Sequence, residues 1–326
     1  MWDTILGHEA NKIFLGNMLQ GERKTPALLF YGPDGIGKKK LAYEFARSFL
    51  CLDDPTHDDC KCRSCRAFCG ESHPDFIYVE GQGARHDILI EQIKEVEKKA
   101  VFSPVLSPYK VCLIDGADRM REEASNSLLK LLEEPPTYWL FILVASEISR
   151  ILPTIRSRLM AIRFEPLHRE KAVRVMEELS VPQGETLARL SDGSPGKALH
   201  LAEAEALMWR ERAIFIIEGI EDPYLMASLA RLEWLGDMDV DQTQTFLEML
   251  LLILRDAMMI QEGSGLLLYN EDERERIASI FASFTLSALK KSLLETERFY
   301  LGLNKGVNTR MILEALFLEI HTFLKE

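Results

Sequence analysis

Four residues near the start of the chain have the types and spacing of a phosphate-binding loop. Gly32, Gly37 and Lys38 match the pattern G-x-x-x-x-G-K-[S/T] in the segment GPDGIGKK, and Gly35 adds a further glycine. Backbone N–H groups of such a loop and the N-terminus of the following helix face phosphate oxygens, and the lysine supplies a positive charge. An apolar run precedes the loop and a helical pattern follows it. This order predicts a P-loop nucleotide site; a turn followed by a basic helix is the alternative.

Hydrolysis of a nucleotide needs residues that this loop lacks. Mg²⁺ is normally held by a hydroxyl directly after the lysine and by an aspartate at the end of a second strand. The aspartate is present as Asp115, but Lys39 replaces the hydroxyl, and an ammonium repels a metal ion. In AAA+ motors a glutamate after the aspartate activates water, and here that position is Gly116. We expect a degenerate nucleotide site lined by Lys39 and Asp115, with weak ATP binding at most and no intrinsic hydrolysis. Asp115 as a turn-capping carboxylate is the alternative.

Five of the six cysteines lie in one short segment, CLDDPTHDDCKCRSCRAFC. The clustered residues are Cys51, Cys60, Cys62, Cys65 and Cys69. In a reducing compartment such clustering indicates a metal rather than disulfides, and thiolates are favoured ligands of tetrahedral Zn²⁺. The segment predicts a structural zinc site, with the choice of four ligands among five left open. A redox-active or simply reduced cluster is the alternative.

Strand and helix patterns alternate through the first half of the chain. We expect strands at residues 27–32, 75–80, within 109–118 and at 139–146, and helices at 38–50, 87–100 and 122–136. Asp87 is the expected N-cap of the second helix, and Pro135 ends the third. This alternation predicts an α/β fold, a parallel sheet with helices on both faces. Ligands then bind at the carboxyl ends of the strands.

The second half has helical patterns only. Short helices are expected after about Phe164, and from about residue 206 the chain is expected to be wholly helical, with breaks at 263–265 and 304–308. The most apolar run, residues 246–260, carries three charged side chains and is too short to span a bilayer. It predicts a buried helix.

Composition restricts the classes of function. The chain has 326 residues, enough for two or three domains, and a formal charge of −12 from 51 acidic and 39 basic side chains. An acidic protein repels a polyanion, so tight DNA binding by the chain alone is not expected. The first residues have no signal-peptide pattern, and we expect a soluble, cytoplasmic protein.

One of the arginines after the last expected strand has the chemistry of an interface residue. Ser157 and Arg158 lie in the segment LPTIRSRL. The planar guanidinium pairs with phosphate oxygens at two points, and an arginine given to a neighbour's nucleotide site raises hydrolysis by about 10³–10⁵-fold in known NTPases. From spacing alone, a surface ion pair is the simpler interpretation.

The ordered set of motifs resembles a known family. The set consists of GPDGIGKKKLA, the cysteine cluster, SHPDF, YKVCLIDGADRM, SNSLLKLLEEPP, LPTIRSR, DGSPGKAL and NKGVNTRMILEALFLEI. Together these motifs resemble the bacterial clamp-loader subunits of DNA polymerase III. The chain is more similar to the delta-prime type than to the gamma/tau motor, because Lys39 and Gly116 replace motor residues and Gly196 stands where the motor has its sensor arginine.

The resemblance implies a domain organisation and a role. It implies an AAA+ P-loop domain at 1–165 with the cysteine cluster inserted at 51–69, a small helical lid at 166–205 and an all-α collar at 206–326. The implied role is that of a rigid, non-catalytic stator beside the gamma/tau motor and delta subunits. The sliding clamp and primed DNA are reached through the complex. Any polymerase activity would belong to the assembled DNA polymerase III holoenzyme.

The resemblance also implies roles for particular residues. Arg158, with Ser157, would be the arginine finger inserted into a neighbour's ATP site, although Leu159 replaces the usual cysteine of that motif. By order along the chain, the zinc ligands would be Cys51, Cys60, Cys62 and Cys65, and Cys69 is an alternative ligand because the spacing is one residue short of the family pattern.

Two other functions are carried as alternatives. One is an active AAA+ ATPase motor of the same complex, in which other residues replace the missing ligands. The other is a zinc-containing DNA-binding module that acts alone, against which the acidic charge argues.

Overall fold

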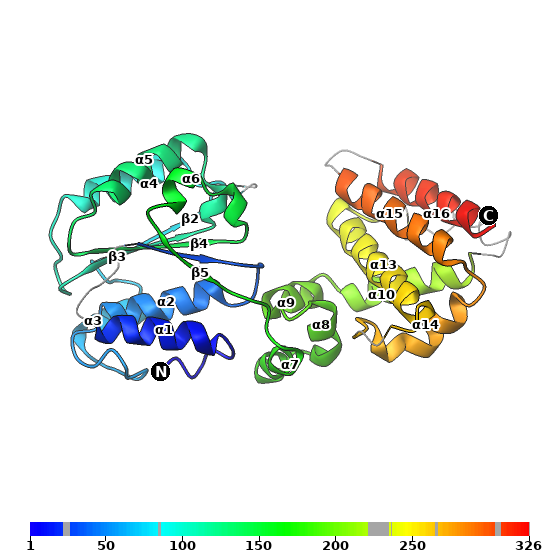
Figure 1. Cartoon of the computed structure of the whole chain (residues 1–326), viewed down its shortest axis with the longest axis horizontal. Helices are drawn as coiled ribbons and strands as arrows, with labels where there is room; N and C mark the ends of the chain where they lie inside the picture. The colour runs from blue at the N-terminus through cyan, green and yellow to red at the C-terminus, as the bar shows by residue number, and fades with distance from the viewer. Residues whose placement is uncertain are drawn as a thin grey trace. The chain divides into compact units, whose positions relative to one another are not determined.

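The computed structural model describes residues 1–21, 27–83, 86–220, 235, 237–264, 267–303 and 308–325. The chain divides into two compact units, Met1–Lys171 and Ala172–Glu326 (Figure 1). The first unit is an α/β layer structure and the second is helical. The three-domain division expected from the sequence stays a prediction.

The first unit is built on a five-stranded sheet in which every neighbouring pair is parallel. The strands are β1 (Ala27–Tyr31), β2 (Phe76–Glu80), β3 (Lys110–Asp115), β4 (Trp139–Ala145) and β5 (Met160–Arg163), in the spatial order β2-β3-β4-β1-β5. The parallel sheet is confirmed. The sequence analysis did not assign β5, which is only four residues long and has a single buried residue, Ile162.

Helices cover both faces of this sheet, as expected (Figure 1). The helices of the first unit are α1 (Glu9–Gln20), α2 (Lys38–Phe49), α3 (Arg63–Cys69), α4 (Ile90–Ala100), η1 (Ala117–Arg119), α5 (Glu122–Glu133), η2 (Ile148–Arg150) and α6 (Pro153–Arg156). Leu28 and Phe30 of β1 point into the core shared with α1 and α2, while Leu29 points into the core shared with α4 and α5. This alternation follows from the two-residue repeat of a strand.

One expected helix boundary is wrong. Asp87 was the expected N-cap of α4, but the helix begins at Ile90 and its N-cap is Leu89. The Asp87 carboxylate instead lies 3.0 Å from the guanidinium of Arg121. The side chain of Gln92 takes the capping role, since it accepts a hydrogen bond from the backbone N–H of Leu89.

The helical half begins with α7 (Arg169–Glu178), which crosses the boundary between the units. The further helices are α8 (Gly184–Leu190), α9 (Pro195–Glu203), α10 (Ala206–Glu218), α13 (Val240–Gln261), η4 (Glu271–Glu273), α14 (Arg274–Ile280), α15 (Leu286–Gly302) and α16 (Thr309–Lys325). The apolar run at 246–260 lies inside α13, which packs against α10 and α15, and its expected burial is confirmed. The break at 263–265 follows the end of α13, and most of the break at 304–308 lies outside the described residues. Among the described residues, no helix is both long and apolar enough to cross a membrane.

Candidate nucleotide site and metal centre

The glycine-rich loop joins β1 to α2, in the strand–loop–helix order that the sequence predicted. Three glycines give the loop its shape, because Gly32, Gly35 and Gly37 all have positive φ, at 146°, 72° and 97°. A Cβ atom at Gly32 would lie 2.2 Å from the carbonyl oxygen of Phe164, so only glycine fits there. Gly37 is the N-cap of α2, and the helix N-terminus therefore opens directly onto the loop.

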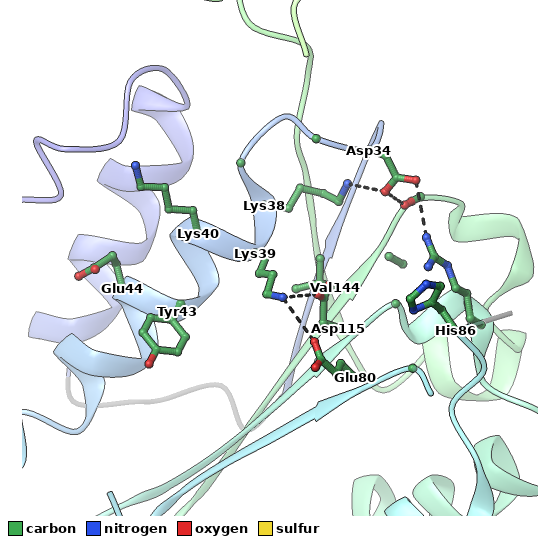
Figure 2. A pocket seen from close by; sticks show the side chains of 17 residues that line it. Asp34, Lys38, Lys39, Lys40, Tyr43, Glu44, Glu80, His86, Asp115 and Val144 are labelled. Atoms are coloured by element: carbon green, nitrogen blue, oxygen red, sulfur yellow. Dashed lines mark hydrogen bonds and ion pairs between the residues drawn. The ribbon is translucent and has the colours of Figure 1, made fainter. Parts of the chain in front are cut away.

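A cavity of about 600 Å³ lies beside this loop, at the carboxyl ends of the strands. Figure 2 shows that its charged lining comes from the loop and α2, from the ends of β2 and β3, and from the turn after β3. The lining includes the predicted Gly35, Gly37, Lys38, Lys39 and Asp115. It also includes Glu80 and Arg119, which the sequence did not single out.

Lys38 is held inside the loop by backbone oxygens. Its side chain is only 5% exposed, and its ammonium donates to the carbonyl oxygens of Gly32 at 2.6 Å and Pro33 at 2.5 Å. The carboxylate of Asp34 lies 3.9 Å away. Burial lowers the pKa of Lys38 below its usual value, and the nearby carboxylates oppose that shift. The ammonium of Lys38 is therefore a buried cation held by the loop beside the cavity.

Lys39 lies between two carboxylates on neighbouring strands. Its ammonium is 3.1 Å from Asp115 and 3.7 Å from Glu80 (Figure 2). The hydroxyl of Tyr78 lies 2.8 Å from Glu80 and 3.2 Å from Asp115, so the two carboxylates share its one donor proton. Burial and these two carboxylates raise the pKa of Tyr78, so its phenol stays protonated and remains a donor. A cation of the protein itself thus lies against the aspartate that binds Mg²⁺ in P-loop enzymes.

The residue after this aspartate has a backbone conformation that favours glycine. Gly116 has φ 78° and ψ 40°, which is the left-handed region. It also has no side chain to activate a water molecule. The site therefore has neither a hydroxyl after Lys38 to bind Mg²⁺ nor a carboxylate after Asp115 to activate water.

Arg158 lies away from this cavity, directly after α6. One guanidinium nitrogen donates to Glu133 at 2.8 Å, and another donates to the carbonyl oxygen of Thr154 at 2.8 Å. Its side chain is 35% exposed, and Ser157 lies beside it. Neither Ser157 nor Arg158 is among the described residues that line the cavity.

Four of the five clustered cysteines converge. The sulfur atoms of Cys51, Cys60, Cys62 and Cys65 all lie within 4.8 Å of one another. Among the residues that the structure describes, Cys69 is not part of this group, and its side chain is exposed. It lies four residues after Cys65 in α3, which is about 6 Å along the helix axis. Four sulfur donors in one shell are the ligand set of a structural zinc site.

Backbone N–H groups donate to two sulfur atoms of the cluster. The N–H of Cys65 donates to the sulfur of Cys62 at 3.4 Å, and the N–H of Asp53 donates to that of Cys51 at 3.5 Å. Burial raises the pKa of Cys51 to about 11 and also raises the pKa of Cys65, whereas at Cys62 backbone donors outweigh burial and lower the pKa to about 7. The residues present therefore fit a metal ion.

A buried arginine from α2 also contacts the cluster. A guanidinium nitrogen of Arg47 lies 3.9 Å from the sulfur of Cys65, and Glu44 accepts from the same side chain at 2.8 Å. Four thiolates around Zn²⁺ leave a net charge of −2, which a cation this close partly offsets. The sequence did not point to Arg47, because it belongs to a different helix from the cysteines.

We expect Arg47→Met to weaken zinc binding by about 10–100-fold, the range seen when outer groups of a metal site are removed. The reason is the loss of the charge beside Cys65, while methionine keeps most of the buried volume. Competition with a chelator of known zinc affinity measures the effect. Arg63→Met is the matched control, because Arg63 is exposed at the start of α3. Equal zinc affinity in the two variants would show that Arg47 has no part in the site.

The SHPDF segment packs the cysteine module against the sheet. Ser64 donates to the carbonyl oxygen of Leu50 at 2.6 Å, and its hydroxyl is 2.8 Å from Nε2 of His73. The backbone N–H of Asp75 donates to Nδ1 of His73 at 3.0 Å, so the neutral ring carries its proton on Nε2. The fully buried Asp75 carboxylate accepts three further backbone hydrogen bonds, from residues 105–107. The motif is therefore structural.

We expect Asp75→Ala to destabilise the first unit by about 3 kcal/mol or more, because it leaves buried N–H groups without an acceptor. Urea unfolding followed by circular dichroism measures the change. Glu91→Ala is the control, since it removes an exposed carboxylate from α4. A urea midpoint for Asp75→Ala equal to that of the control would exclude this structural role.

An all-parallel sheet with a P-loop at its carboxyl edge, followed by a helical unit, defines a protein of the AAA+ P-loop class. Family models described as "DNA polymerase III, delta subunit" and "DNA polymerase III, delta subunit, C terminal" match residues 7–168 and 225–322. The chain belongs to the delta-prime family of DNA polymerase III subunits, which is related to gamma/tau.

Curated relatives match most of the chain. DNA polymerase III subunit delta' of Bacillus subtilis is 29% identical over 309 residues, 93% of each chain. The subunit of the same name from Escherichia coli is 28% identical over 312 residues, 94% of this chain and 92% of that protein. The one from Pseudomonas aeruginosa is 33% identical over 201 residues, which is 60% of each.

A gamma/tau-type relative and a solved structure also match this chain. DNA polymerase III subunit tau of Bacillus subtilis is 32% identical over 211 residues, 62% of this chain and 37% of that protein. The crystal structure of a DNA polymerase III gamma subunit-related protein from Thermotoga maritima covers 95% of this chain and 99% of its own, with 16% identity and a TM-score of 0.43.

Proposed function

We propose that the chain is a non-catalytic stator subunit of the DNA polymerase III clamp loader. In this role it helps to load the sliding clamp on primed DNA, and it gives Arg158 to the ATP site of a neighbouring gamma/tau motor. Membership of the delta-prime family supports the complex. The single observation that carries the non-catalytic role is the position of Lys39, 3.1 Å from Asp115.

This position argues directly against hydrolysis. A Mg²⁺ ion at Asp115 would have to displace an ammonium that is already paired with that carboxylate and with Glu80. No hydroxyl follows Lys38 to complete the metal site, and Gly116 offers no base for water. The P-loop thus keeps its shape while the groups that transfer the phosphoryl are replaced.

The test of this proposal is to measure steady-state ATP turnover with Mg²⁺ for the purified chain and for its Lys38→Ala variant. We expect no difference between the two, because neither protein has the groups that bind the metal and activate water. A rate that Lys38→Ala abolishes would favour the alternative, an active motor subunit of the same complex.

Arg158 has the exposure that a role across a subunit interface needs. It lies outside its own chain's cavity, and its planar fork is presented at the surface next to Ser157. Its hydrogen bond to Glu133 holds the side chain in place without burying it. We propose that this fork contacts phosphate oxygens of a nucleotide bound to the neighbouring subunit.

The cysteine cluster supports a structural zinc ion held by Cys51, Cys60, Cys62 and Cys65. Free clustered cysteines also support a location in the reducing cytoplasm. The net charge of −12 supports contact with primed DNA through the assembled complex rather than through this chain alone. Polymerase activity would then be a property of the holoenzyme.

A further inference from the structure

We propose that the cavity beside the P-loop binds the phosphates of a nucleoside di- or triphosphate without a divalent cation, with the ammonium of Lys39 taking the place of the metal. The inference rests on the proposed non-catalytic function. It goes beyond that function, because it assigns the site a ligand and a mode of binding.

The first argument is the balance of charge at the strand ends. Glu80 and Asp115 lie side by side in register on β2 and β3, facing the cavity. In a metal-dependent site such carboxylates need a divalent ion before an anion can approach. Here the ammonium of Lys39 lies between them (Figure 2) and offsets one of their two negative charges. The hydroxyl of Tyr78, within hydrogen-bond distance of both carboxylates, reduces the repulsion of an anion further.

The second argument is the charge at the start of α2. This 12-residue helix begins with Lys38, Lys39 and Lys40, and its first turn has no acidic residue. Cations at a helix N-terminus oppose the helix dipole, which favours negative charge there. An anion in the cavity would offset this unfavourable interaction, because it would contact both the lysine ammonium groups and the backbone N–H groups at the N-terminus of α2.

The third argument is the room and the donors left for phosphate. The cavity volume of about 600 Å³ suits a small-molecule ligand. Lys38 can exchange its carbonyl partners for phosphate oxygens by a side-chain movement alone. Arg119 faces the loop from the turn after β3, where its guanidinium is 3.9 Å from Asp34. These groups recognise phosphate and select no particular base.

Isothermal titration of the full chain with ATP, ADP and inorganic pyrophosphate, each in EDTA and in excess Mg²⁺, tests the inference. We expect ATP and ADP to bind in EDTA, and Mg²⁺ to leave the affinity unchanged or weaken it, because the metal complexes the free nucleotide in solution. Lys38→Ala should weaken binding in EDTA about tenfold or more, the effect of one lost charged contact. Pyrophosphate binding would show that the phosphates alone suffice.

Lys39→Thr is the decisive variant, since it restores the hydroxyl and removes the built-in cation. We expect its nucleotide binding to become Mg²⁺-dependent, with affinity at least about tenfold higher in Mg²⁺ than in EDTA. Lys98→Ala is the matched control, because it removes an exposed lysine that pairs with Glu95 on α4, and it should behave as the wild type. Circular dichroism checks that all variants are folded.

The possible failures separate the two proposals. Binding by the wild type only in Mg²⁺, or no binding of any of the three ligands, overturns the metal-independent site and leaves the stator role intact. Turnover of ATP by the wild type during the titration would instead overturn the non-catalytic function.

Discussion

Arg158→Ala is expected to lower the ATP turnover of the reconstituted clamp loader by about tenfold or more when primed DNA and sliding clamp are present. The guanidinium would stabilise negative charge that develops on the transferred phosphoryl group in the neighbouring subunit. Alanine removes both the charge and the fork. Steady-state ATPase of the complex built with wild-type or variant subunit measures the effect, while the chain alone stays inactive in both forms.

Two further variants make this experiment specific. Arg156→Ala removes an exposed arginine two residues away on α6 and should leave the rate unchanged. Arg158→Lys keeps the charge but loses the two-point geometry, so it should recover only part of the rate. Gel filtration establishes that each variant still assembles. A complex with Arg158→Ala that hydrolyses ATP at the wild-type rate would exclude the finger role.

Removal of the metal is expected to unfold the segment around the cysteines. Apparent binding energies of structural zinc sites are about 10–16 kcal/mol at neutral pH, more than this short segment can replace by packing. Cys51→Ser and Cys60→Ser should each lose stoichiometric zinc, and hydrogen exchange should rise in α3 (Arg63–Cys69). Metal analysis of protein purified without chelator gives the first measurement, with one zinc per chain expected.

Cys69→Ser is the internal control for this prediction. It removes a cysteine of the same segment that lies outside the convergent group, so zinc content and exchange rates should not change. Protein that contains no zinc, or equal loss of zinc in Cys69→Ser and Cys51→Ser, would contradict the four-cysteine site.

The central strands were predictable because of their burial. Parallel strands in the middle of a sheet are covered on both faces, so β3 and β4 are nearly continuous apolar runs that the sequence shows directly. The edge strand β5 has one buried residue, and the apolar run at 159–162 is much shorter than that of β4. The long buried strands are therefore easier to detect than the short strand β5, although the other edge strand, β2, was predicted.

The parts of the site that escaped prediction depend on lateral contacts. Glu80 and Tyr78 meet Lys39 only because β2 lies next to β3, and Arg47 meets Cys65 only because α2 packs beside the cysteine segment. The spacing of residues within a short segment does not reveal either of these contacts between separate elements. The P-loop and the cysteines were predictable because each is a short motif whose residues are close together in the chain.

The backbone at Gly116 affects what a substitution there could recover. A glutamate restored there would have to adopt a left-handed conformation, at a cost of about 1–2 kcal/mol for a non-glycine residue. A hydroxyl restored at position 39 would at the same time leave Asp115 and Glu80 without their shared cation. Neither substitution alone supplies both missing groups, so recovery of ATP hydrolysis would need at least the two changes together.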